Sequence, residues 1–184
     1  MIKVNIIHMK KMKLRLALTA SAIAAGLICS FQPSFAEKGS SSYKVLASTD
    51  YGFNVMTVES HIKKGEEYFL QNDLKKAEEE FLTARKMSLA LISFYKDISN
   101  SFKGLDARIP REMNSNNREA IRSLANSNLR LAAVYRKKKE SGTAVPLLVE
   151  ALKIMTPAKS EGQEAYQALY ELGFVNTPYR GAKR

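Results

Sequence analysis

Side chains that could act as nucleophiles or hold a metal ion are few in this sequence. The 184 residues include one cysteine, Cys29, and two histidines. Zinc sites and thiol nucleophiles need several cysteine and histidine side chains together, and only His61 lies beyond the first 36 residues. Neither the glycine-rich loop of nucleotide-binding proteins nor the nucleophile elbow of hydrolases is present. We therefore predict a protein that is not an enzyme and uses no metal or other cofactor.

A run of three acidic residues, Glu78–Glu80, is the other group that could hold a cation. Lys75, Lys76 and Lys86 lie close to it in the sequence. On the outer face of a helix, such charge pairs contribute about 0.3–0.5 kcal/mol each. We interpret the run as charge that supports a helix, and we expect His61 to be a packing residue and not a ligand.

The first 36 residues have the three parts of a secretory signal. They contain five basic residues and no acidic residue, then an apolar run of 13 residues from Leu16 to Ile28, and they end in Ser34-Phe35-Ala36. A helix that spans a bilayer needs about 20 residues. We predict a signal peptide over residues 1–36, starting at Met1, Met9 or Met12, and export to a periplasm or a thylakoid-lumen-type compartment. The alternative is a retained segment that anchors the chain in a membrane through residues 14–28.

Removal of such a signal changes the charge and narrows the classes of partner. The remaining chain keeps 24 of the 29 basic residues and all 18 acidic residues, so its net charge is +6. Export separates a protein from nucleic acid, and we expect no nucleic-acid partner. We predict a protein or peptide partner, with an anionic membrane surface as a further candidate.

Helical periodicity extends through residues 58–173, and we predict one all-α domain between a flexible linker over 37–57 and a basic C-terminal tail over 174–184. The clearest helix begins at Leu74, where Asp73 can cap it. From Ala77 to Phe102 its apolar and small residues recur at alternating intervals of three and four. This pattern predicts one long central helix that ends at Gly104.

Shorter helices are predicted on both sides of the long one. Ile109-Pro110 predicts a break over residues 105–115, because the residue before a proline is disfavoured in the helical region. Ser115 or Asn116 can then cap the next helix. The predicted helices cover residues 59–70, about 116–137, 144–155 and 161–172.

Small and aromatic residues are spaced in two matching sets along these helices. Ala77 to Ala84 and Ala144 to Ala151 are equal intervals, and each set contains a tyrosine in its first helix. The sets are Gly65, Tyr68, Ala77, Phe81 and Ala84, and Ala132, Tyr135, Ala144, Leu148 and Ala151. This pattern resembles the tetratricopeptide repeat (TPR) family, in which 34-residue helix pairs stack. Because Gly65 and Ala132 lie 67 residues apart, we expect a degenerate repeat between them; two unrelated hairpins are the alternative.

The resemblance implies an α-solenoid, a stack of antiparallel helix hairpins whose first helices line a concave groove. Residues of those helices away from the hairpin seam would face a partner: Ile62, Glu66, Phe69, Leu70, Leu129, Arg130, Ala133 and Arg136. Their mixture of apolar and cationic side chains suits a segment with large apolar residues and an acidic residue.

We therefore predict an exported, non-enzymatic TPR-like scaffold or adaptor. One alternative is a membrane-tethered assembly factor that contacts anionic lipid or a cell-envelope polymer through its basic face. Another is that residues 37–57 or the long helix cover the apolar residues of the groove.

Overall fold

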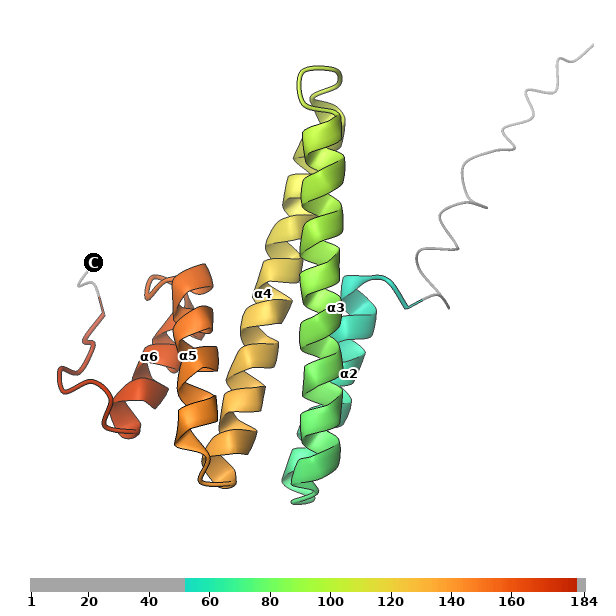
Figure 1. Cartoon of the computed structure of the whole chain (residues 1–184). Coiled ribbons are helices and arrows are strands. Elements are labelled where there is room, and N and C mark those ends of the chain that lie inside the picture. Colours follow the sequence, from blue (N-terminus) through green and yellow to red (C-terminus); the bar gives the residue numbers. More distant parts are fainter. Residues whose placement is uncertain (1–51, 182–184) are drawn as a thin grey trace, which may run out of the picture. The chain divides into compact units, whose positions relative to one another are not determined.

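A computed structural model describes residues 52–181 of the chain (Figure 1). These residues form five α-helices and no strand: α2 (Val55–Leu70), α3 (Leu74–Ser101), α4 (Arg108–Lys137), α5 (Ser141–Met155) and α6 (Ser160–Glu171). The predicted all-α class is confirmed for this part of the chain. The predicted signal over 1–36 and most of the predicted linker lie outside the described residues. Within residues 52–181, no helix is both long and apolar enough to cross a membrane.

Each helix packs against the next one in the chain, and α4 also contacts both α2 and α6. Short turns join α2 to α3 and α4 to α5, so the members of each pair run antiparallel (Figure 1). As a result, α2, α4 and α6 run in the same direction and form one layer, and α3 and α5 form the other.

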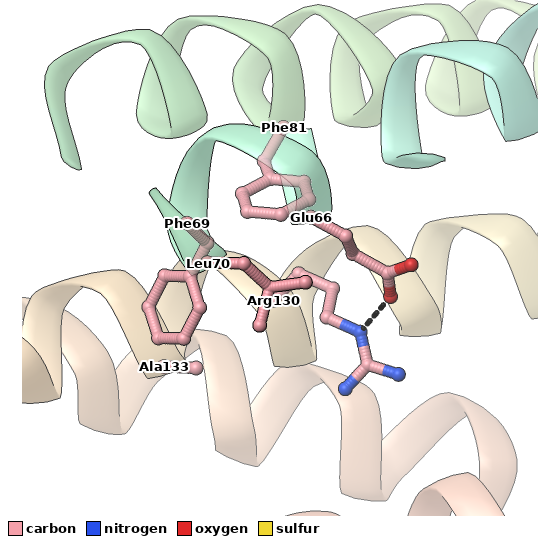
Figure 2. Close-up of a pocket in the computed structure, with 6 residues that line it drawn as sticks. All are labelled: Glu66, Phe69, Leu70, Phe81, Arg130 and Ala133. Carbon is pink, nitrogen blue, oxygen red and sulfur yellow. Dashed lines mark hydrogen bonds and ion pairs between the residues drawn. The ribbon is translucent and has the colours of Figure 1, made fainter. Parts of the chain in front are cut away.

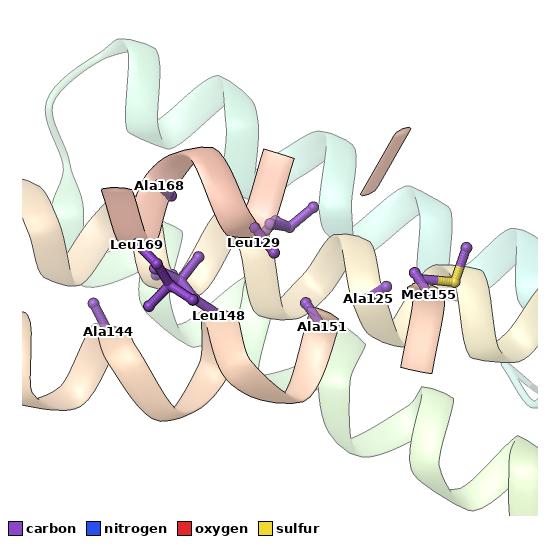
Figure 3. Close-up of a cluster of buried hydrophobic side chains, with 10 residues drawn as sticks. Ala125, Leu129, Ala144, Leu148, Ala151, Met155, Ala168 and Leu169 are labelled. Carbon is purple, nitrogen blue, oxygen red and sulfur yellow. The ribbon is translucent and has the colours of Figure 1, made fainter. Parts of the chain in front are cut away.

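The helices are joined by buried clusters in which alanines occupy the closest contacts. Ala77 and Ala84 of α3 and Ala144 and Ala151 of α5 have no exposed surface. Figure 3 shows the largest cluster, which brings together apolar side chains of α4, α5 and α6. Two smaller clusters join α2, α3 and α4. Small side chains at these positions let the helix backbones approach each other.

The closest approach of α2 to α3 is at Gly65. A Cβ atom on Gly65 would lie 2.5 Å from Cε1 of Phe81, a contact that no real side chain makes. Phe81 is only 1% exposed, so its ring fills the space that the glycine leaves. The close contact in the first helix pair is therefore a glycine beneath an aromatic ring.

The break predicted over residues 105–115 is wrong in extent: residues 102–107 join two long helices, where one is predicted. Helix α3 has 28 residues and α4 has 30. Helix α4 begins at Arg108, which places Pro110 in its first turn. The N–H groups of a first turn have no partner within the helix, so a proline there removes no hydrogen bond.

The predicted degenerate repeat between the two hairpins is also absent from residues 52–181. The residues that were expected to form it lengthen α3 and α4 instead, and the two helices meet at a turn through Gly104, whose φ is +84°. Helices α2 and α4 consequently contact each other directly.

Other helix ends differ from the predictions by a few residues. Asp73 caps α3 as predicted, and its carboxylate accepts a hydrogen bond from the Lys76 N–H at 3.2 Å. Helix α2 begins at Val55 and not at Glu59, because Asn54 caps it, so the last residues of the predicted linker are helical. In the predicted tail, Val175 packs against the α4–α5–α6 cluster.

Candidate functional site

An open cavity of about 250 Å³ lies between α2 and α4; we call it the α2–α4 cavity. Figure 2 shows its lining: Glu66, Phe69, Leu70, Phe81, Arg130 and Ala133. Almost all of the lining surface is apolar, since the two charged side chains lie at one edge. Leu70, in the last turn of α2, is 84% exposed. The cavity therefore offers apolar contact that no residue of the described chain uses.

A second cavity of about 240 Å³ lies between α4 and α6; we call it the α4–α6 cavity. Ala133 lines both cavities, so the two adjoin across α4, and together we call them the groove. The remaining residues of the second cavity come from three helices: Leu129, Arg136, Leu148, Glu164, Gln167, Ala168 and Glu171.

Ion pairs connect the three helices that border the groove. The Arg130 Nε donates to Glu66 Oε1 of α2 at 2.7 Å, and its Nη1 donates to Glu164 Oε1 of α6 at 3.2 Å. Arg136 Nη2 donates to Glu171 Oε2 at 2.7 Å, and this arginine holds the pKa of Glu171 below its usual value. One guanidinium, that of Arg130, thus links α2 to α6 across α4.

The arginines of the groove are therefore already engaged within the chain. The carboxylates that hold Arg130 and Arg136 are themselves at or near the groove surface, so an acidic partner would have to displace a glutamate. A different cation lies beside the α2–α4 cavity: the Lys137 ammonium sits 4.8 Å from the centre of the Phe69 ring. None of the ion pairs within residues 52–181 includes Lys137.

The structure brings most of the predicted partner-facing residues together. Glu66, Phe69, Leu70, Arg130 and Ala133 line the α2–α4 cavity, and Leu129 and Arg136 line the α4–α6 cavity.

Two of these residues are more buried than expected. Leu129 is only 4% exposed and belongs to the α4–α5–α6 cluster, so it forms the floor of its cavity. Ile62 does not line the groove: it packs against both clusters that join α2, α3 and α4. Ile62 lies one helical turn before Glu66, in the part of α2 that residues of α3 and α4 cover.

The predicted site residues include none from α6. Helix α6 supplies Glu164, Gln167, Ala168 and Glu171 to the groove. A usable signal is present, because Ala165 follows Ala132 by roughly one repeat period of 34 residues. That spacing places α6 where the first helix of a further pair would lie.

The acidic run also behaves differently from its prediction. Glu78 accepts hydrogen bonds from the Lys138 ammonium and from the Tyr135 hydroxyl, the latter at 2.6 Å, which ties α3 to the end of α4. Lys138, and then Tyr135, hold the pKa of Glu78 below its usual value. Burial, with help from Glu78, raises the pKa of Tyr135 to about 12.

Glu80 pairs with His61 of α2 at 2.5 Å, so this histidine makes a polar contact and is not only a packing residue. The expected pairs with nearby lysines are not formed; Lys76 instead pairs with Asp73 at 2.9 Å. In residues 52–181 no group of three histidine, cysteine or acidic side chains is placed to hold a metal ion.

The groove combines an apolar floor with charged side chains at its edges. Its apolar floor can take a side chain, and its charged side chains can orient one. Buried clusters and ion pairs join α2, α4 and α6 within the chain, so the groove has its shape without a bound partner. No protein-family model matches this sequence, and comparison with curated proteins and with solved structures finds no match either.

Proposed function

We propose that this chain is a TPR-like scaffold that holds a segment of a partner protein in the groove. The observation that carries the proposal is the open apolar α2–α4 cavity, beside which Leu70 is 84% exposed. Sites that bind a ligand or a peptide are typically concave and mostly apolar, with a few polar groups that orient the bound molecule. Because buried clusters already hold the helices together, binding does not incur the free-energy cost of ordering the site.

The packing of the helices supports a curved, TPR-like stack. The backbone of α4 lies close to the backbones of α2 and α6, whereas the backbones of α3 and α5 do not approach each other as closely. Arg85 spans that wider gap: it donates to Asn128 of α4 at 2.8 Å and to Glu150 of α5 at 2.8 Å. Helices lie closer on the inner side of a curved stack, so α2, α4 and α6, with the groove, would form the concave side.

The shape of the groove suits a peptide, because the α2–α4 cavity of about 250 Å³ adjoins the α4–α6 cavity and the two follow one side of the helix stack. A single large apolar side chain would serve as the anchor. An acidic residue beside it would meet Lys137, since the groove arginines are already paired.

The first 36 residues support a location outside the cytoplasm, and we include export in the proposal. Mass spectrometry of the protein from its host would test this part. A chain that begins at Glu37 is the expected result, and a chain that retains residues 14–28 would favour the membrane-anchored alternative.

The binding function can be tested with a displayed library of random peptides. Peptides selected on the wild-type chain should carry a large apolar residue. Two variants should weaken their binding at least tenfold: Leu70→Asp puts a charge at the edge of the cavity, and Ala133→Leu fills both cavities. A tenfold loss corresponds to about 1.4 kcal/mol.

A matched control is Leu82→Asp, because Leu82 is a half-exposed leucine of α3 that does not line the groove. This variant should bind the selected peptides as the wild type does, with unchanged helicity by circular dichroism. Equal binding by the wild type, Leu70→Asp and Ala133→Leu would show that the groove is not the binding site.

A further inference from the structure

The ends of α3 and α4 form a projecting hairpin that the groove does not use. No residue from 92 to 119 is buried, and in Figure 1 this part of the two helices extends beyond α2 and α5. We call residues 92–119 the arm. Only its base takes part in the core, because Ile92 and Tyr95 pack against a buried cluster, and the length beyond them needs an explanation.

The end of the arm carries apolar side chains in the position where turns are usually polar. Leu105 is 79% exposed and Phe102 is 37% exposed, on either side of Lys103 and Gly104. Leu105 is thus mostly uncovered, and about a third of Phe102 reaches the surface. The structure thus keeps two large apolar side chains at its most projecting point.

A cationic hollow lies directly beside this apolar end. It has a volume of about 450 Å³, and its charged lining consists of Lys103, Arg111 and Arg118, with no carboxylate. None of these three cations has an ion pair within residues 52–181. By contrast, the other arginines of α3 and α4 are all paired with carboxylates: Arg85, Arg108, Arg122, Arg130 and Arg136.

We propose that the end of the arm docks on an anionic membrane surface. Leu105 and Phe102 would enter the interface between headgroups and acyl chains, and Lys103, Arg111 and Arg118 would meet lipid phosphates. A protein partner fits less well, because a stable protein interface needs about 800 Å² on each side and the end of a single hairpin is narrow. A lipid surface needs charge and apolar side chains but no matching shape. This site lies apart from the groove and does not depend on its function.

A single tryptophan can report on the arm, because the chain contains none. The full-length Leu105→Trp variant should show a blue-shifted emission with vesicles that contain phosphatidylglycerol, and brominated lipids should quench it. Vesicles of phosphatidylcholine alone should have little effect. The control is Leu82→Trp, on a part of α3 away from the arm, whose emission should not change. The emission shifts only if the tryptophan at position 105 enters the lipid. Membrane binding through the apolar run of residues 16–28 would not by itself produce this shift.

The cations are tested in the Leu105→Trp background. Replacing Arg111 and Arg118 by glutamate should weaken the vesicle response at least tenfold, since each cation near an anionic surface contributes about fivefold. The matched control replaces Lys86 and Lys153, two exposed lysines without ion pairs in residues 52–181, by glutamate and changes the net charge equally. It should retain most of the response. Circular dichroism would verify that both variants are folded.

Three results would overturn the proposal. One is a Leu105→Trp reporter that anionic vesicles do not shift. Another is equal weakening by both charge-reversal pairs, because net charge alone would then explain binding. The third is an equal response to soluble polyglutamate, which would make the arm a contact for acidic protein.

Discussion

Replacement of Gly65 by alanine tests the contact that sets the spacing of α2 and α3. The new Cβ would lie 2.5, 2.7 and 2.9 Å from three atoms of the Phe81 ring. The ring has little room to move, because it is 1% exposed and shares a buried cluster with Leu131 and Val134 of α4. Either the ring or the whole of α2 has to shift.

The magnitude follows from two opposing effects. Overpacking a buried site destabilises a protein by about 1–3 kcal/mol, and the rigid surroundings of Phe81 favour the upper part of this range. Alanine is better than glycine inside a helix by about 0.8–1.0 kcal/mol. We therefore expect Gly65→Ala to lower the free energy of unfolding by about 1–2 kcal/mol.

Urea denaturation followed by circular dichroism would measure this change, and a second substitution isolates its cause. Phe81→Leu removes the ring atoms that meet the new Cβ. In that background Gly65→Ala should be neutral or stabilising by up to about 1 kcal/mol, as helix propensity alone predicts. If Gly65→Ala leaves the wild-type chain as stable as before, or if its effect is the same in both backgrounds, the close contact does not govern the spacing of the helices.

Three further predictions concern other contacts. Gly162→Ala should destabilise the chain by about 2–3 kcal/mol in thermal unfolding, because its Cβ would lie 1.9 Å from the Thr156 carbonyl oxygen; a neutral result would contradict the packing of α6. Arg130→Met should reduce stability by about 0.5–1 kcal/mol at low salt and by much less in 1 M NaCl, and an effect that salt does not change would rule out an ion-pair contribution. The pKa of Tyr135 is raised to about 12 by burial and Glu78, so its contribution to stability is complete below about pH 10 and is lost as the pH rises through 12. Tyr135→Phe should therefore remove part of the stability loss between pH 10 and 12, and the same pH profile in both proteins would refute this origin.

Features that depend on neighbouring residues could be predicted from the sequence. The start of α3 follows from Asp73, whose side chain caps the helix, and the run from Ala77 to Phe102 predicts its length closely. The same periodicity identifies the seam of each helix pair, and residues off that seam include most of the groove lining. These inferences succeed because caps and helical periodicity act over a few residues.

Features that depend on contacts between distant residues could not be predicted. Pro110 is compatible with a break or with a first helical turn, and only the position of α4 against α3 decides between them. The sequence contains 29 basic and 18 acidic residues, so it cannot identify which basic side chain pairs with Glu78 or with Glu66. The arm and the ion pairs of the groove both belong to this class.

The groove is the site that we propose receives a partner segment. Amide chemical shifts of the isotope-labelled chain, measured with and without a selected peptide, would test this most directly. We expect the largest changes at Phe69, Leu70, Ala133 and their neighbours on α2, α4 and α6. Changes confined to α3, α5 or the arm, with the amides of the groove unaffected, would contradict it.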